Sequence, residues 1–118
     1  MRSKSKECLY GGLSNMSNDG FTITMKNERT LTVTDKYYSL RDGEGHLMDA
    51  VRFEDIIQCE VSAVKQYALV IEEDDQKPAE EWETLAGEKC ELFGGTHYLY
   101  FDNSENLLKV YYFIRRHT

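Results

Sequence analysis

Short runs in which apolar and polar residues alternate occupy most of this chain. Phe21, Ile23 and Met25 alternate with threonines and a lysine, and Leu31 and Val33 repeat the pattern between further threonines. A period of two places all the apolar side chains on one face of a β-strand. Such a face is buried only when strands pair into sheets that enclose a core, so a mainly β fold is predicted.

The alternation recurs along the chain, between residues that favour turns. Further strands are predicted at 38–40, 47–53, 57–63, 67–71, 90–93 and 97–101, with Cys59 as a small core residue. The clearest turn is Asp-Gly-Glu-Gly at 42–45, because glycine adopts positive φ without a steric penalty. Between Val33 and Tyr38 the apolar positions pass from odd to even numbers, which predicts a tight turn at Asp35 and Lys36.

The last segment changes to a helical period. Leu107, Leu108, Tyr111 and Ile114 recur at helical spacing, and Val110 lies beside that stripe. This spacing lines one face of an amphipathic helix. Asp102 followed by Glu105 is typical of a capping box that starts such a helix. We expect about seven antiparallel strands in a bent sheet whose open end is closed by this helix.

Acidic residues are concentrated in one stretch of the chain. Residues 72–91 contain nine acidic residues and two lysines, whereas the remainder has twelve residues of each sign. Dense charge around Pro78 predicts a solvated acidic loop between strands. A nucleic-acid-binding protein requires a basic surface. The sequence therefore excludes nucleic acid as a partner.

The chain of 118 residues is the usual size of one domain. We expect an N-terminal tail or extension at 1–19 and one domain at 20–118, with the acidic loop at 72–91. No apolar run is long enough to span a bilayer, and the opening residues lack the apolar core of a secretory signal. Cys8, Cys59 and Cys90 are odd in number and have no C-x-x-C spacing. Reduced thiols in a cytoplasmic protein are therefore expected.

Three segments carry a resemblance to a known family. They are 31–40 (Leu-Thr-Val-Thr-Asp-Lys-Tyr-Tyr-Ser-Leu), 51–56 (Val-Arg-Phe-Glu-Asp-Ile) and 58–61 (Gln-Cys-Glu-Val). With the terminal helix they resemble pleckstrin-homology-like (PH-like) domains, most closely the GRAM-like variety. The resemblance implies a barrel of about seven antiparallel strands, in two near-orthogonal sheets, capped by one C-terminal helix. Such helices usually carry a core-facing tryptophan, where this chain has Val110 or Tyr111.

The resemblance further implies recruitment to a protein or to membrane phosphoinositides. A candidate site for a lipid headgroup consists of the basic residues around the first turns: Lys26, Arg29, Lys36 and Arg41. Ammonium and guanidinium groups from neighbouring turns can converge on phosphates. Glu28, Asp35 and Asp42 are interleaved with them and lower the local potential. The alternative interpretation is a solvated face of mixed charge.

A candidate site for a protein partner lies in the acidic segment and comprises Glu73, Asp74, Asp75, Glu80, Glu81 and Trp82. Carboxylates suit a basic surface or peptide, and a tryptophan is a typical anchor at interfaces. The alternatives are a solubilising loop and a Trp82 that folds back over a sheet edge. Paired tyrosines such as Tyr98 and Tyr100 are a further candidate, because an exposed row can receive an extended peptide by strand addition.

No recurring catalytic or metal-binding spacing joins His46, His97 and His117, and no phosphate or dinucleotide motif is present. We therefore expect a non-enzymatic adaptor without cofactor or metal, cytoplasmic or peripheral to a membrane or a cytoskeletal assembly. A protein partner is favoured over lipid, because the negative inner leaflet repels an acidic chain. Three alternatives stay open: a phosphoinositide-dependent membrane-targeting domain, a small β-barrel for an apolar ligand, and an enzyme using His97 with a carboxylate such as Glu91.

Overall fold

Nine strands, two short 3-10 turns and one α-helix make up the described part of the structure, a computed structural model that describes residues 20–92 and 94–118. The tail predicted at 1–19, with Cys8, lies outside the described residues. The strands are β1 (Gly20–Thr24), β2 (Thr30–Thr34), β3 (Tyr37–Arg41), β4 (Leu47–Arg52), β5 (Ile56–Val61), β6 (Ala68–Glu73), β7 (Glu81–Glu83), β8 (Lys89–Glu91) and β9 (Gly95–Tyr100). The other elements are η1 (Lys26–Glu28), η2 (Phe53–Asp55) and the helix α1 (Ser104–His117).

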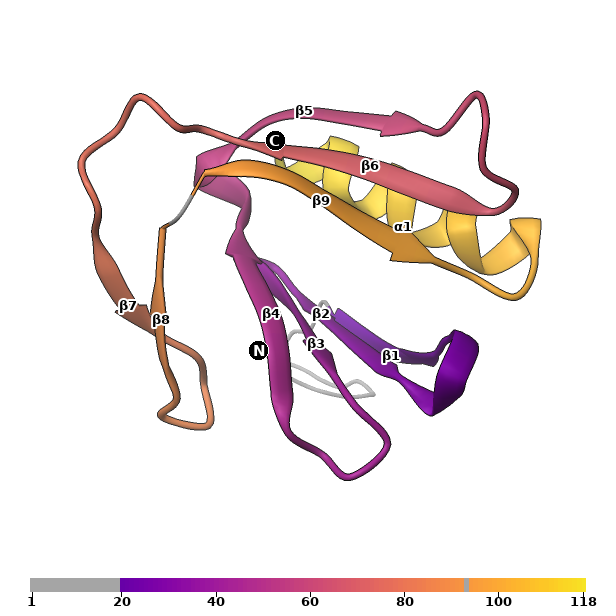
Figure 1. Cartoon of the computed structure of the whole chain (residues 1–118), viewed down its shortest axis with the longest axis horizontal. Coiled ribbons are helices and arrows are strands. Elements are labelled where there is room, and N and C mark those ends of the chain that lie inside the picture. Colours follow the sequence, from indigo (N-terminus) through magenta and orange to yellow (C-terminus); the bar gives the residue numbers. More distant parts are fainter. Residues whose placement is uncertain (1–19, 93) are drawn as a thin grey trace, which may run out of the picture.

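The described strands form three antiparallel sheets, none of them a closed barrel. β1 to β4 pair in chain order as a four-stranded meander, and β5, β6 and β9 form a three-stranded sheet with β6 in the middle. β7 and β8 form a separate hairpin. Figure 1 shows the two larger sheets as separate layers, with the hairpin on the β4 side of the molecule. The predicted mainly β class, with antiparallel strands and a C-terminal helix, is confirmed.

The turn predicted between β2 and β3 is present and absorbs the change of phase. The Thr34 hydroxyl oxygen accepts hydrogen bonds from the amides of Lys36 and Tyr37, both at 3.1 Å. This side-chain turn reverses the chain within two residues. As a result Val33 of β2 lies opposite Tyr38 of β3, and both side chains are fully buried on the same face of the sheet.

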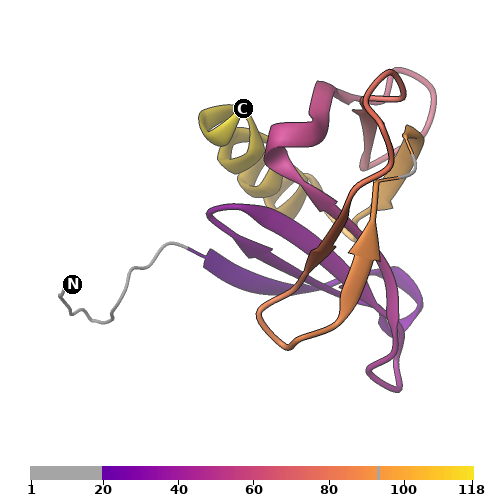
Figure 2. The ribbon, with the colours of Figure 1, turned by 90° about the vertical axis from the view of Figure 1, so that its left-hand side faces the viewer.

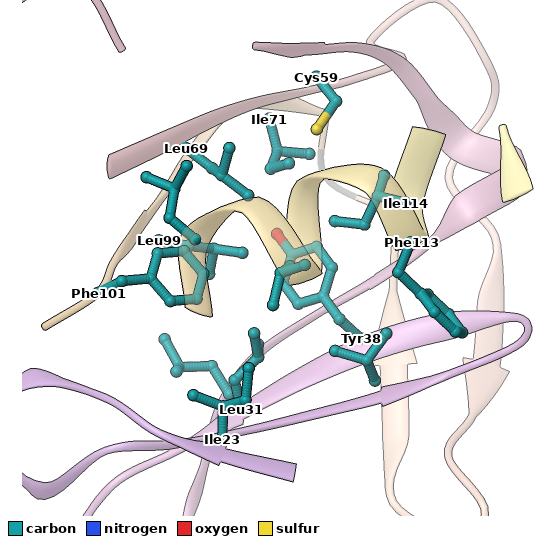
Figure 3. Close-up of a cluster of buried hydrophobic side chains, with 14 of the residues drawn as sticks. Ile23, Leu31, Tyr38, Cys59, Leu69, Ile71, Leu99, Phe101, Phe113 and Ile114 are labelled. Carbon is teal, nitrogen blue, oxygen red and sulfur yellow. The ribbon is translucent and has the colours of Figure 1, made fainter. Parts of the chain in front are cut away.

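The core lies between the two larger sheets and the helix (Figure 3). Leu31 and Tyr38 enter it from the four-stranded sheet, Leu69 and Leu99 from the three-stranded sheet, and Ile114 from the helix. All five side chains are fully buried. Cys59 also lies in the core, as predicted. Packed side chains therefore occupy the space that a small apolar ligand would need.

Helix α1 begins one residue later than the capping pattern predicts. The N-cap is Asn103, whose side-chain oxygen accepts a hydrogen bond from the Asn106 amide at 2.9 Å. The prediction that Asp102 is the cap is wrong; asparagine fills this position as well as aspartate does. The buried face of the helix consists of Leu107, Val110, Phe113 and Ile114. Leu108 is exposed, so the apolar stripe is rotated relative to the predicted one.

The acidic stretch at 72–91 contains ordered strands in addition to loops. It includes the end of β6 and the whole β7–β8 hairpin, which Figure 2 shows in front of the sheets. The hairpin packs on the four-stranded sheet through Trp82, whose ring centroid lies 5.2 Å from that of Tyr37. The Tyr37 hydroxyl accepts a hydrogen bond from the Leu85 amide at 2.9 Å. This segment is therefore not a simple solvated loop, because the contact between Trp82 and Tyr37 holds the hairpin against the sheet.

Candidate functional site

The structure separates the four basic residues of the predicted headgroup site. Lys26 and Arg29 flank the turn between β1 and β2, whereas Lys36 lies beyond the opposite end of β2. Five residues of strand separate the two turns, about 17 Å at the usual rise. Arg41 returns to the first end, but its guanidinium binds both carboxylate oxygens of Glu88. Of these four residues, only Lys26 and Arg29 therefore lie close together, at the turn between β1 and β2.

A small pocket marks that place. It measures about 80 Å³ and is lined by Lys26, Arg29 and two tyrosines of β9, Tyr98 and Tyr100. The tyrosine rings stack with their centroids 6.2 Å apart, and Tyr98 is exposed.

No helix in the described part of the chain has the length and apolar character needed to cross a membrane.

The predicted protein-binding residues fall into three environments. Glu73 is buried inside the molecule, with 2% of its surface exposed. Asp74 and Asp75 accept hydrogen bonds from the backbone and side chain of Gln76, both at 2.8 Å. These residues shape the loop after β6. Only residues from Glu80 to Trp82 belong to the hairpin region.

Two ion pairs tie the hairpin region to the four-stranded sheet. The Arg52 guanidinium at the end of β4 binds Glu80 at 2.6 Å, and Arg41 at the end of β3 binds Glu88. The pKa of the Glu88 carboxyl lies below its ordinary value, chiefly because of the hydrogen bond from Arg41. Anchors at both ends of the hairpin fix its orientation on the sheet. Arg52 also lies 5.6 Å from the Trp82 ring.

A buried carboxylate anchors the loop that leads into the hairpin. Asp55 is fully buried and accepts hydrogen bonds from Arg52 Nε at 2.9 Å and from Lys77 Nζ at 2.5 Å. The hydrogen bond to Asp55 raises the pKa of Lys77 above its ordinary value. The two cations compensate the buried carboxylate, which would be costly to bury without a partner. In the sequence Asp55 was noted only as part of the segment 51–56 that carries the family resemblance.

The hairpin presents three exposed carboxylates on one face. Glu81, Glu83 and Glu91 are exposed, and alternation places them on the opposite side of the hairpin from Trp82, together with Lys89, which lies opposite Glu83. We call these three residues the acidic face. Glu81 lies directly opposite Glu91 in the register. Like charges in this position repel each other, so a cation placed between them is stabilised.

Trp82 packs against the sheet of its own chain, which was one of the two interpretations that the sequence left open. Its ring is half-buried between Tyr37 and Arg52. Its indole nitrogen is buried and has no hydrogen-bond partner among the residues that the structure describes. Trp82 therefore fastens the hairpin to the four-stranded sheet.

A partly buried polar cluster joins the two larger sheets. His97 of β9 binds Asp49 of β4 through Nδ1 at 2.8 Å and Glu73 of β6 through Nε2 at 2.9 Å. The pKa of His97 is raised, chiefly by the hydrogen bond to Asp49 and against the opposing effect of burial. The pKa of Tyr38 is raised well above its ordinary value by burial and by the charges of Asp49 and Glu73. Glu91, the carboxylate proposed for an enzyme, is in the hairpin instead.

Sequence reasoning missed this cluster although a signal was present. Asp49 alternates with Leu47 and Val51, and Glu73 continues the buried series of Leu69 and Ile71. A charged residue at an inward-facing strand position needs a partner. In the structure Asp49 and Glu73 are those partners, because each contacts one ring nitrogen of His97.

Comparisons with known proteins add no relative. No protein-family model matches the chain, and neither the curated proteins nor the solved structures contain a match. The likeness to PH-like domains therefore stays a prediction, and function is inferred from the geometry of the chain itself.

Proposed function

We propose that this chain is a non-enzymatic binding module that recruits a protein partner with a basic surface or segment. The observation that carries the proposal is the acidic face, Glu81, Glu83 and Glu91, on a hairpin that is anchored to the four-stranded sheet. The anchors described above fix the orientation of these carboxylates before a partner arrives. A preorganised net negative charge steers association and selects a partner of opposite charge.

The order of elements supports a PH-like arrangement. A four-stranded meander is followed by a three-stranded sheet and by a C-terminal helix packed in the shared core. In this plan the β7–β8 hairpin is an insertion between β6 and β9. The acidic face thus belongs to the part of the chain that such a fold does not require, which favours a role in recognition. We place the module in the cytoplasm, or peripheral to a membrane or cytoskeletal assembly.

The non-enzymatic assignment is supported by the surroundings of His97. Its two ring nitrogens bind Asp49 and Glu73, and its side chain is 15% exposed. A general base needs a nitrogen within reach of the substrate. The filled core likewise disfavours the alternative of a barrel for an apolar ligand.

A phosphoinositide remains the second candidate ligand, and the pocket with Lys26 and Arg29 is the observation that favours it. Two basic residues are few for a multiply charged headgroup. Flotation with phosphoinositide liposomes tests this candidate. Binding that is lost in Lys26→Glu with Arg29→Glu supports it, and absence of wild-type binding removes it.

Affinity capture from the source cell tests the leading proposal with two matched triple variants. Glu81→Lys, Glu83→Lys and Glu91→Lys reverse the acidic face. Glu44→Lys, Glu60→Lys and Asp102→Lys change the net charge equally at exposed sites outside the hairpin. We expect the first variant to lose a partner that the second retains, with both variants folded. A captured set that is the same for both variants contradicts the proposal.

A further inference from the structure

A groove separates β4 from the hairpin. It measures about 300 Å³ and is lined by residues 47–50 of β4 on one side. The other side consists of all three residues of β8 together with Glu81. Figure 1 places the hairpin beside β4, which is the last strand of the four-stranded sheet. We call this space the β4–β8 groove.

The backbone of β4 offers unused hydrogen-bonding groups to this groove. The Phe53 amide donates to the Lys36 carbonyl at 2.8 Å, and Val51 lies opposite Tyr38 in the same register. Hydrogen-bonded pairs alternate along an antiparallel ladder. The N–H and C=O of Ala50 therefore point away from β3, toward the free edge. No described residue outside the sheet makes a backbone hydrogen bond to Ala50.

The backbone of β8 has the same property. The Leu92 amide donates to the Glu80 carbonyl at 3.1 Å, and the Thr84 amide donates to the Glu88 carbonyl at 3.0 Å. By the same alternation, the backbone groups of Lys89 and Glu91 point away from β7. Two strand edges thus border one groove. An extended chain between them gains hydrogen bonds from both sides.

The charge of the groove indicates what kind of chain fits. Alternation makes Glu81 and Glu91 a pair without mutual backbone hydrogen bonds, the kind whose Cα atoms are only about 4.5 Å apart. Their carboxylates stand next to each other at the groove, while Lys89 is the cation among its lining residues. A lysine or arginine of an incoming strand relieves this repulsion. Alternate side chains of that strand share one face, so a basic residue at every second position matches the site.

We propose that an extended basic segment of the partner protein adds as a strand in the β4–β8 groove, bonded to the backbone of β4 and of β8. This inference rests on the proposed function and names how the partner is recognised. The backbone of the groove supplies affinity, and Glu81 with Glu91 selects lysine or arginine at alternate positions. A bulge lies in β4 where the register shifts opposite Leu40 and Arg41. It ends regular pairing there, so the groove takes a short segment only.

The peptide Lys-Thr-Lys-Thr-Lys-Thr is the probe, and Glu-Thr-Glu-Thr-Glu-Thr is its charge-reversed control. Amide hydrogen exchange of the full chain is followed by NMR with each peptide. We expect the Lys-Thr peptide, and not the Glu-Thr control, to slow amide hydrogen exchange at Ala50, Lys89 and Glu91. A version of the Lys-Thr peptide N-methylated at alternate residues should bind about tenfold more weakly or worse, because it loses hydrogen bonds to a strand edge.

Two variants separate the strand addition from the charge recognition. Ala50→Pro removes an N–H that points away from β3 and keeps the hydrogen bonds of its neighbours to β3. We therefore expect about a tenfold loss of peptide affinity. A thermal melt checks that the variant is folded. Glu81→Gln with Glu91→Gln should weaken binding and its salt dependence, whereas Glu60→Gln with Glu105→Gln should not.

Binding that needs the two glutamates but tolerates N-methylation and Ala50→Pro overturns the strand addition and leaves the proposed function intact. Binding insensitive to the glutamates contradicts both. Slowed exchange at Ala50 in a concentration-dependent dimer without peptide also overturns it, because the edge would then pair with a second copy.

Discussion

His97 Nδ1 lies 2.8 Å from the Asp49 carboxylate and thereby joins the three-stranded sheet to the four-stranded sheet. The same ring binds the buried Glu73 through its other nitrogen. The His97 ring, between two carboxylates, makes a polar contact between the two sheets. The relative position of the sheets, and of the hairpin attached to one of them, depends in part on this cluster.

Stability should fall as the pH rises above about 6.5, the ordinary pKa of histidine. The pKa of His97 is raised in the folded chain, so its contribution is fully present below the unfolded value of about 6.5. That contribution is lost as the pH rises through the folded pKa. Urea denaturation at pH 6 and at pH 9 measures the difference. His97→Gln should flatten the pH dependence in this window, and an unchanged slope in that variant would show that another group titrates.

Removal of the His97 ring should destabilise the fold by roughly 3 kcal/mol, because it leaves the Glu73 charge buried without its partner. The second change Glu73→Gln in the His97→Ala background should recover part of this loss, since it removes the buried charge. Chemical denaturation of both single variants and the double variant completes the cycle. Strictly additive effects would mean that the two side chains do not interact.

Trp82→Ala should release the hairpin while leaving the core folded. Loss of the contacts with Tyr37 and Arg52 removes the aromatic anchor, at a cost of about 2 kcal/mol for a half-buried ring. Limited proteolysis should then cut within 80–91 before it cuts elsewhere. The exposed Leu85→Ala, on the same hairpin, serves as the control. Equal protection of the hairpin in wild type and Trp82→Ala would refute the anchoring role.

Asn103→Ala should cost about 1 kcal/mol of stability, because Asn103 caps helix α1. Asp102→Ala, one residue earlier, should change the free energy of unfolding by much less. Paired denaturation curves decide between them. A larger effect at Asp102 would restore the capping box inferred from the sequence.

The sequence patterns predicted the strands well where alternation is regular, as in β2, where Leu31 and Val33 are buried and their neighbours are not. The change of phase before Tyr38 also predicted the correct turn. The hairpin was harder to foresee, because β7 and β8 are only three residues long and highly charged. Their stability comes from Trp82 and from ion pairs with Arg41 and Arg52, distant contacts that no local pattern encodes.

The candidate site was predictable only in part. The cluster of acidic residues at 72–91 is visible in the sequence, and this stretch does contain the acidic face. Glu73 belongs to the interior instead, because its odd position continues the buried series through Ile71. The separation of Lys36 from Lys26 follows from the length of β2, which the predicted strands already implied.

A photo-crosslinking amino acid placed at position 83 or at position 60, in the source cell, tests the recruitment claim most directly. Both positions are exposed, but position 83 lies on the acidic face and position 60 on β5. We predict a specific protein crosslinked from position 83 through a lysine- or arginine-rich segment, and not from position 60. A partner crosslinked only from position 60, or one joined at position 83 through an acidic segment, would contradict recruitment by the hairpin.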